Sequence, residues 1–437
     1  MVVGSVSVLE VAHGVGRVYE SPLPVWLYGV GAAATVAISF LIRAAVSAEP
    51  KERVPSVLIG PRAAMVLIMI IRGAALSALF LMLLAGILVR DRGLSLAPLL
   101  FWIALVVGTA AVCALVDGFW DAADPWATIE RFYRLEDAPR TATPPWWLGP
   151  VMLYTLFWFE LVSGVGFDAV AVVVALFAYS LYAFSFRARW GERWRDTDPL
   201  SILFGFAGAC APLRISKDGL EYRRWLTELD RPDAVSKTAF ACVFVLLGAT
   251  TLDNVRETTG WHNFLQSARA DALPAMVVDS LALAAFAGVF LAPYALAMWA
   301  TARSMRASGS VRAEMRRFAW SLIPIGIAYL LAHNAPLLMT GTPRVIEYLS
   351  DPFEKGWNIF GTANLFDTYL PSPQLVWLME IVLIIGGHVL GVLAAHRIAV
   401  RRAGSHAAAV KSQVALTVLM SFFTIATLVL LGQPLIA

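Results

Sequence analysis

The feature that most constrains this chain is a series of long apolar segments that few charged residues interrupt. An α-helix rises about 1.5 Å per residue, so about 20 apolar residues cross the hydrocarbon core of a bilayer. We therefore predict an all-α, polytopic transmembrane helical bundle with about ten spanning helices. The predicted spans are 24–45, 63–89, 94–119, 146–164, 168–186, 237–252, 274–302, 318–340, 374–395 and 410–435.

A further apolar piece, 201–213, is too short to span a bilayer, and we expect it to be re-entrant or interfacial. We divide the chain into an outer N-terminal segment, 1–23, and a single transmembrane domain, 24–437. No internal repeat is evident.

The composition excludes several other classes of protein. The chain is 59% hydrophobic and 15% charged, whereas soluble domains are about 45–50% apolar and about 25% charged. The net charge of +3 is too small to indicate a nucleic-acid partner. The three cysteines, Cys113, Cys210 and Cys242, match neither a metal-binding spacing nor a disulfide framework.

The distribution of basic residues predicts the orientation. Most of the 34 lysines and arginines lie in loops that alternate spans place on one side. Such loops face the cytoplasm. We predict a multi-pass protein of the cytoplasmic membrane with both termini outside. The predicted inner loops are 43–62, 120–145, 187–237, 303–317 and 396–411.

Five acidic or imidazole side chains lie close to the predicted outer ends of five different helices. By helical rise, each is within about 11 Å of the outer end of its span. Charged groups are costly inside a bilayer and usually have a partner or a function there. We predict that these residues form one outer layer; they are Glu160, Asp253, Asp279, His333 and Glu380.

Carboxylates and an imidazole at one depth suit a divalent metal such as zinc or copper. They equally suit a proton relay, or hydrogen bonds to neighbouring helices. We assign all five residues as candidate metal ligands, and Glu160, Asp253 and Glu380 as candidate catalytic groups.

The segment around His333 predicts a broken helix beneath a structured loop. Pro336 removes a backbone donor and frees the carbonyl of Ala332. Broken helices in membranes are tolerated where they line a cavity or lie buried in protein. The outer loop 341–373 is rich in turn formers and aromatics, and we predict that it folds back as a lid.

His388 lies much deeper, in the inner half of its span. It is a candidate cofactor-binding residue, with haem as the alternative cofactor, or a packed histidine. Gly386 and Gly387 precede it and favour close approach of another helix. On the inner side, 117–126 carries three acids among aromatics, and we expect an interfacial anchor there.

Several short motifs resemble a family of prokaryotic polytopic membrane proteins labelled fenitrothion hydrolase. The similarity covers most of the chain, from about residue 12 to 402. The motifs are 350–353 (SDPF), 356–357 (GW), 360–363 (FGTA), 387–389 (GHV), 395–396 (AH), 12–14 (AHG), 23–27 (LPVWL), 125–126 (PW), 158–161 (WFEL) and 211–213 (APL).

This resemblance implies a subunit of a metal-dependent, phosphotriester-type hydrolase in a prokaryotic cytoplasmic membrane. It also implies a hetero-oligomer with a similar polytopic chain and a smaller exported subunit. Two alternatives remain open. One is a subunit of a respiratory or oxidase complex, in which His333 and His388 bind haem or copper. The other is a transporter, which the broken helix favours.

Overall fold

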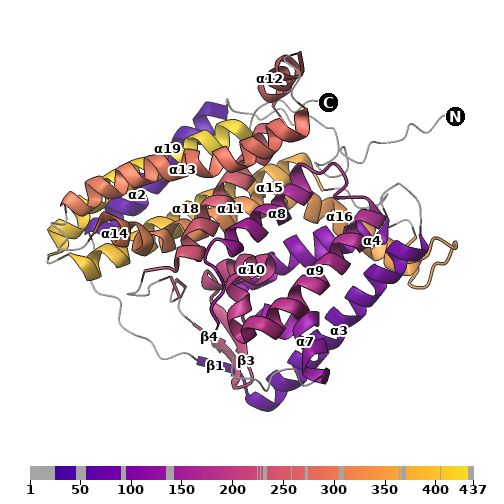
Figure 1. The fold of residues 1–437 in the computed structure, drawn as a ribbon. Coiled ribbons are helices and arrows are strands. Elements are labelled where there is room, and N and C mark those ends of the chain that lie inside the picture. Colours follow the sequence, from indigo (N-terminus) through magenta and orange to yellow (C-terminus); the bar gives the residue numbers. More distant parts are fainter. Residues whose placement is uncertain are drawn as a thin grey trace.

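The structure is a bundle of long, tilted helices that lie side by side, with a small sheet at one end (Figure 1). It is a computed structural model. It describes residues 25–45, 56–89, 95–133, 142–223, 225–226, 228–229, 234–256, 258–270, 274–304, 310–363, 365, 371–403 and 405–431. The predicted outer segment 1–23 lies outside this part of the chain.

The following helices lie in the apolar segments of the sequence. They are α2 (Val25–Ala45), α3 (Pro61–Leu88), α8 (Leu148–Leu161), α9 (Ala169–Trp190), α11 (Lys237–Arg256), α13 (Ala275–Ser304), α15 (Ile323–His333), α18 (Pro373–Arg402) and α19 (His406–Leu431). Another helical stretch is built from α4 (Leu96–Leu99), the π-helical turns η1 (Leu100–Gly108) and α5 (Thr109–Leu115).

Shorter helices connect or cap these elements. They are α6 (Phe119–Ala123), α7 (Pro125–Tyr133), η2 (Gly191–Asp196), α10 (Pro199–Ala209), α12 (Thr259–Ala270), α14 (Val311–Phe318), η3 (Ala319–Leu322) and α16 (Ala335–Ser350).

The chain is a multi-pass membrane protein. Within the described residues, seven helices are long and apolar enough to cross a membrane. The count rises to eight if the bent pair Val311–His333 and Ala335–Ser350 forms one span. Two further apolar helices, Trp26–Ile42 and Leu148–Leu161, are shorter. The helical, polytopic prediction is confirmed, whereas the count of about ten spans is not.

The short apolar piece that we expected near 201–213 forms α10, which has only 11 residues. The carboxylate of Asp198 accepts a hydrogen bond from the Ser201 backbone N–H at 2.9 Å and so caps the start of α10. The helix is almost wholly buried and packs against α5 and α8. Its first turn is therefore capped by a side chain within the protein.

A four-stranded sheet was not predicted from the sequence. Its order is β1 (Ser56–Ile59), β4 (Gly219–Tyr222), β3 (Leu213–Ser216) and β2 (Val116–Asp117). Gly219, with a φ of 146°, closes the tight β3–β4 turn. The strands have two to four residues, too few for an alternating pattern to stand out. The sheet joins two predicted inner loops, 43–62 and 187–237, to the end of the predicted span 94–119.

Two glycines set the register between α15 and α18. A Cβ on Gly387 would lie 2.8 Å from the carbonyl oxygen of Pro324, and one on Gly391 would lie 2.7 Å from that of Ser321. The later glycine, Gly391, meets the earlier partner, Ser321 of η3, so α18 runs antiparallel to η3 and α15. The predicted close approach is confirmed at Gly387, whereas a Cβ on Gly386 would meet nothing within 4 Å.

Candidate functional site

The site begins on α11, one of the most buried of the long helices. This helix packs against α8, α13 and α15, and most of its last three turns is buried. Asp253 lies in its last turn and is only 7% exposed. The neighbouring Asn254 donates from its side-chain amide to the carbonyl of Thr250 at 3.1 Å. The sequence thus places a carboxylate on a helix that the rest of the bundle surrounds.

His333 is the last residue of α15, where the helix breaks. The Asn334 backbone N–H still donates to the carbonyl of Leu330 at 3.1 Å, but Pro336 in the next turn has no N–H to donate. The helix resumes as α16 after a bend of 52°. The predicted break beside His333 is confirmed.

Asp253 and His333 contact each other directly. The distance between His333 Nε2 and Asp253 Oδ2 is 2.6 Å, and each side chain is only 10% exposed. A neutral imidazole donates a hydrogen bond to a carboxylate in this arrangement, and a protonated one forms an ion pair with it. The pair can therefore hold or release a proton without losing its contact.

Glu160 joins the pair from a third helix. It lies near the end of α8, which packs against α11, and its carboxylate is within electrostatic range of both Asp253 and His333. Three of the five residues predicted to form an outer layer thus come together from α8, α11 and α15.

Glu380 lies at the same level on a fourth helix. Ile384, one turn further along α18, belongs to a small buried cluster with Tyr329 and Ala332 of α15. Because α18 is antiparallel to α15, moving one turn back along α18 corresponds to moving one turn forward along α15, from Tyr329 to His333. Glu380 is 9% exposed, so a fourth predicted residue is buried at this depth.

Asp279 has partners of a different kind. Its carboxylate accepts hydrogen bonds from the Arg256 guanidinium at 3.3 Å and from the Trp261 indole N–H at 3.2 Å. These contacts join α13 to the end of α11 and to α12. Asp279 is buried as predicted, but its charge is balanced by an arginine.

The residues of this cluster are not arranged as a metal shell. In the part of the chain that the structure describes, no three His, Cys, Asp or Glu side chains are placed to hold one ion. The Nε2 atom of His333 already contacts Asp253. The metal site therefore stays a prediction.

His388, the predicted cofactor ligand, is 3% exposed on α18. Its Nδ1 lies 2.8 Å from the carbonyl oxygen of Ile384 on its own helix. It lines a small apolar cavity, in which the centre of a water molecule can occupy a volume of about 20 Å³. A porphyrin is far larger than this, so haem at His388 would require the surrounding helices to separate.

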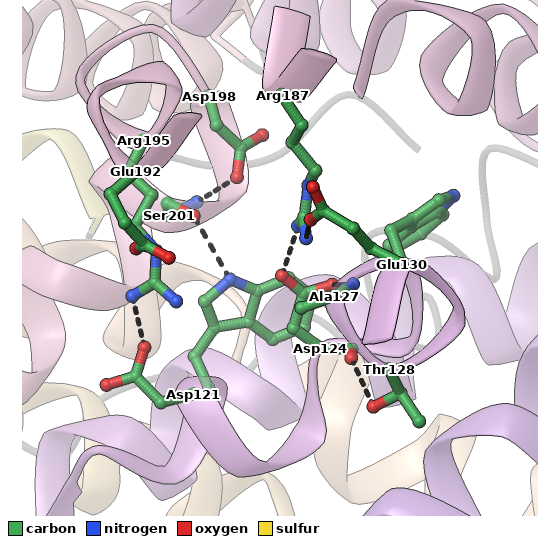
Figure 2. Close-up of polar contacts among 12 residues, drawn as sticks. Asp121, Asp124, Ala127, Thr128, Glu130, Arg187, Glu192, Arg195, Asp198 and Ser201 are labelled. Atoms are coloured by element: carbon green, nitrogen blue, oxygen red, sulfur yellow. Dashed lines mark hydrogen bonds and ion pairs between the residues drawn. The ribbon is translucent and has the colours of Figure 1, made fainter. Parts of the chain in front are cut away.

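The segment 117–126, which we predicted to lie on the inner side, forms a second charged region. Figure 2 shows part of it, around Asp121 and Asp124. The Arg187 guanidinium of α9 donates to the carboxylate of Asp124, and at 3.1 Å to that of Glu130. The same guanidinium lies over the ring of Trp194, 4.2 Å from its centre. Asp124 also accepts from the Ala127 backbone N–H at 2.9 Å, so it caps α7.

The network extends along η2 and α10. Arg195 pairs with Asp121, and the Trp120 indole N–H donates to the hydroxyl of Ser201 at 3.2 Å (Figure 2). The Tyr179 hydroxyl donates to the carboxylate of Asp198 at 2.7 Å.

The expectation of an interfacial anchor in 117–126 needs correction. Trp120 is 6% exposed and Trp126 is 1% exposed, so both rings pack inside the protein. Asp124, Asp121 and Asp117 bind arginines that lie 63, 74 and 106 residues further along the chain. No local spacing signals such pairs, although the arginines of the loop 187–237 were a hint.

The outer loop after α16 folds on its own backbone. Asp351 accepts hydrogen bonds from the backbone N–H groups of Lys355 and Gly356, at 2.8 and 2.7 Å. Together with α16, the loop borders an open groove of about 480 Å³, whose lining includes Arg344, Glu347 and Trp357. The first third of the predicted lid 341–373 is helical, because α16 continues to Ser350.

Comparisons with known proteins add no identity. No family model, no curated protein sequence and no solved structure matches this chain.

Proposed function

We propose that this protein is a proton-coupled membrane transporter in which Asp253 and His333 form the proton-binding site. The observation that carries the proposal is their 2.6 Å contact, buried in the bundle where α15 breaks. Transporters commonly place their binding sites at broken helices, because the interruption exposes polar backbone to a cavity.

The charges around the pair support a cationic occupant. Asp253 and Glu160 bring two carboxylates within electrostatic range of one imidazole. If both acids are ionised, a proton on the imidazole balances one of the two negative charges. The negative charge that remains, together with Glu380 at the same level, would then favour uptake of a further proton or another cation.

The low exposure of the pair also favours transport over chemistry on a bulky substrate. Side chains that are only 10% exposed can exchange a proton through a narrow path. A phosphotriester would need to reach the imidazole within hydrogen-bond distance. Opening of the α15–α16 bend would be required before such a substrate could enter.

The test is proton flux into liposomes that contain the purified protein and an internal pH-sensitive dye. We expect Asp253→Asn and His333→Gln each to lower the flux about 100-fold, as loss of an essential proton carrier does. His262→Gln, which alters an exposed histidine on α12, is the matched control and should retain the flux. Unchanged flux in both site variants would overturn the proposal.

A second candidate function is the hydrolase activity that the resemblance implies. Two observations favour it. The carboxylate of Asp253 orients His333 as an acid orients the imidazole of a general base. The outer groove also presents Arg344, whose guanidinium suits a phosphoryl oxygen. In this proposal the chain acts with a similar polytopic chain and a smaller exported subunit.

The two candidates separate in one assay of the native assembly. Hydrolysis of a 4-nitrophenyl phosphotriester, measured with and without added zinc, supports the second candidate if both His333→Gln and Arg344→Gln abolish it. Turnover that neither substitution changes would rule it out for this chain.

A further inference from the structure

A small cavity lies between α11, α13, α15, α18 and α19, below the Asp253–His333 pair. Its walls are mostly apolar and include Phe244, Leu247, Phe290, Ile325, Leu419 and Met420. The centre of a water molecule can occupy a volume of about 20 Å³ in this cavity. Roughly 10–15 Å³ by this measure is enough to hold one water molecule. The cavity is thus the size of a single water molecule.

The lining includes Nε2 of His388 and the hydroxyl oxygen of Thr251, which are buried and, within the described part of the chain, have no hydrogen-bond partner. The hydroxyl of Tyr294, which also lines the cavity, already donates to the carbonyl of Met315 at 2.7 Å. Buried polar atoms without a partner are destabilising, so a ligand that bonds to both atoms is favoured.

The tautomer of His388 decides what that ligand must supply. Its Nδ1 lies 2.8 Å from the carbonyl oxygen of Ile384, which can only accept, so Nδ1 carries the hydrogen. In the neutral ring Nε2 is then an acceptor and needs a donor in the cavity. Water supplies that donor, and its oxygen can accept from the Thr251 hydroxyl. An apolar ligand would satisfy neither atom.

Two of the helices that line the cavity, α11 and α15, also carry the proposed proton-binding pair. Tyr329 lines it and sits one helical turn, about 6 Å, before His333 on α15. Thr251 is on α11, two residues before Asp253. His388 approaches from the inner half of α18, eight residues beyond Glu380.

We propose that one water molecule binds between His388 Nε2 and Thr251 Oγ1 and relays protons between His388 and the Asp253–His333 pair. The relay rests on the transport function proposed above. When the pair gives a proton to the water, the water gives one of its own hydrogens to His388 Nε2, and the ring becomes an imidazolium. In the reverse transfer Nε2 returns its hydrogen to the water and the water gives a proton to the pair, so the water is regenerated in both directions.

The water site is tested by NMR of protein labelled with ¹⁵N-histidine, using magnetisation transfer from water to the His388 ring. His388→Gln identifies the signal. We expect the transfer in the wild type and a loss of about tenfold in Thr251→Val, which removes one of two polar partners. Thr250→Val is the matched control, because the Thr250 hydroxyl bonds to the carbonyl of Leu246 and does not line the cavity. Absence of transfer in the wild type would overturn the site, as would equal transfer in Thr251→Val.

The relay is tested by proton flux in the same variants. We expect Thr251→Val and His388→Phe to lower the flux about tenfold or more, while Thr250→Val leaves it unchanged. If Asp253→Asn abolishes flux but Thr251→Val and His388→Phe retain it, the relay is wrong and the transport function stands. If the wild type carries no flux, both are wrong, and the NMR experiment alone decides the water site.

Discussion

Two regions bury carboxylates in this protein, and they balance the negative charge in different ways. On the side predicted to face the cytoplasm, Asp124 and Glu130 share the guanidinium of Arg187. Near the predicted outer side, Asp253 contacts the imidazole of His333, with Glu160 in electrostatic range. Arginine stays protonated throughout the physiological pH range, whereas histidine titrates within it.

The difference separates a fixed junction from a site that can change its charge. The inner network joins 117–133 to α9 and η2 through arginines, which stay protonated. The Asp253–His333 cluster lies at a bend of 52° and pairs a carboxylate with an imidazole. Under the proposed function, we therefore expect proton transfer at the buried acid whose partner titrates and a structural role for the acids paired with arginine.

The largest expected effect is on folding. Arg187→Gln should lower the free energy of unfolding by about 3–5 kcal/mol, because it leaves the buried carboxylate of Asp124 and the partly buried carboxylate of Glu130 without their cation. Thermal unfolding in detergent measures the loss. Arg189→Gln, at an exposed position two residues further along α9, should have little effect. Equal stability of the two variants would show that Arg187 does not stabilise the fold by balancing Asp124 and Glu130.

A crossed pair of isosteric changes sharpens the comparison. Asp253→Asn should lower proton flux about 100-fold and alter thermal stability only modestly. Asp124→Asn should destabilise the protein by about 3 kcal/mol, and the folded fraction should keep its flux per molecule. Flux is normalised to folded protein by size-exclusion chromatography. If Asp124→Asn also abolishes the flux of folded protein, the inner network is part of the transport machinery.

The register that brings Glu380 level with His333 predicts a difference between adjacent glycines. Gly387→Ala should cost about 1–3 kcal/mol of stability, since the added methyl group meets Ala328 and the Pro324 carbonyl. Gly386→Ala meets nothing within 4 Å and should be neutral or stabilising. Equal melting temperatures would show that α15 and α18 do not pack in this register.

The smallest effect is expected at Asp279, the acidic residue that pairs with Arg256. Asp279→Asn should cost about 1 kcal/mol, because an amide oxygen can still accept from Arg256 or Trp261. Proton flux should stay within twofold of the wild type if the arginine-paired acid is structural. A flux loss as large as that of Asp253→Asn would place Asp279 in the proton path after all.

The sequence predicted what depends on position along one helix. Apolar length indicated the spans, Pro336 indicated the break, and helical rise gave Glu160, Asp253, His333 and Glu380 a common depth. Depth cannot say which helices are neighbours, so the sequence could not distinguish Asp279, which meets Arg256, from Asp253, which meets His333.

The inner side was harder to predict for the same reason. The partners of Asp121 and Asp124 lie on a helix and turn that follow a later span. The small sheet pairs 56–59 with 219–222 across more than 150 residues. Both depend on contacts between distant segments, which apolar periodicity does not encode.

The most direct test of the account is the ¹⁵N NMR signal of the His333 ring as the outer pH changes between about 5 and 8. We predict that the ring gains and loses a proton in this interval, and that Asp253→Asn shifts the transition because it removes the carboxylate in contact with Nε2. A His333 signal that does not respond to pH in the wild type would contradict the claim that this pair carries protons.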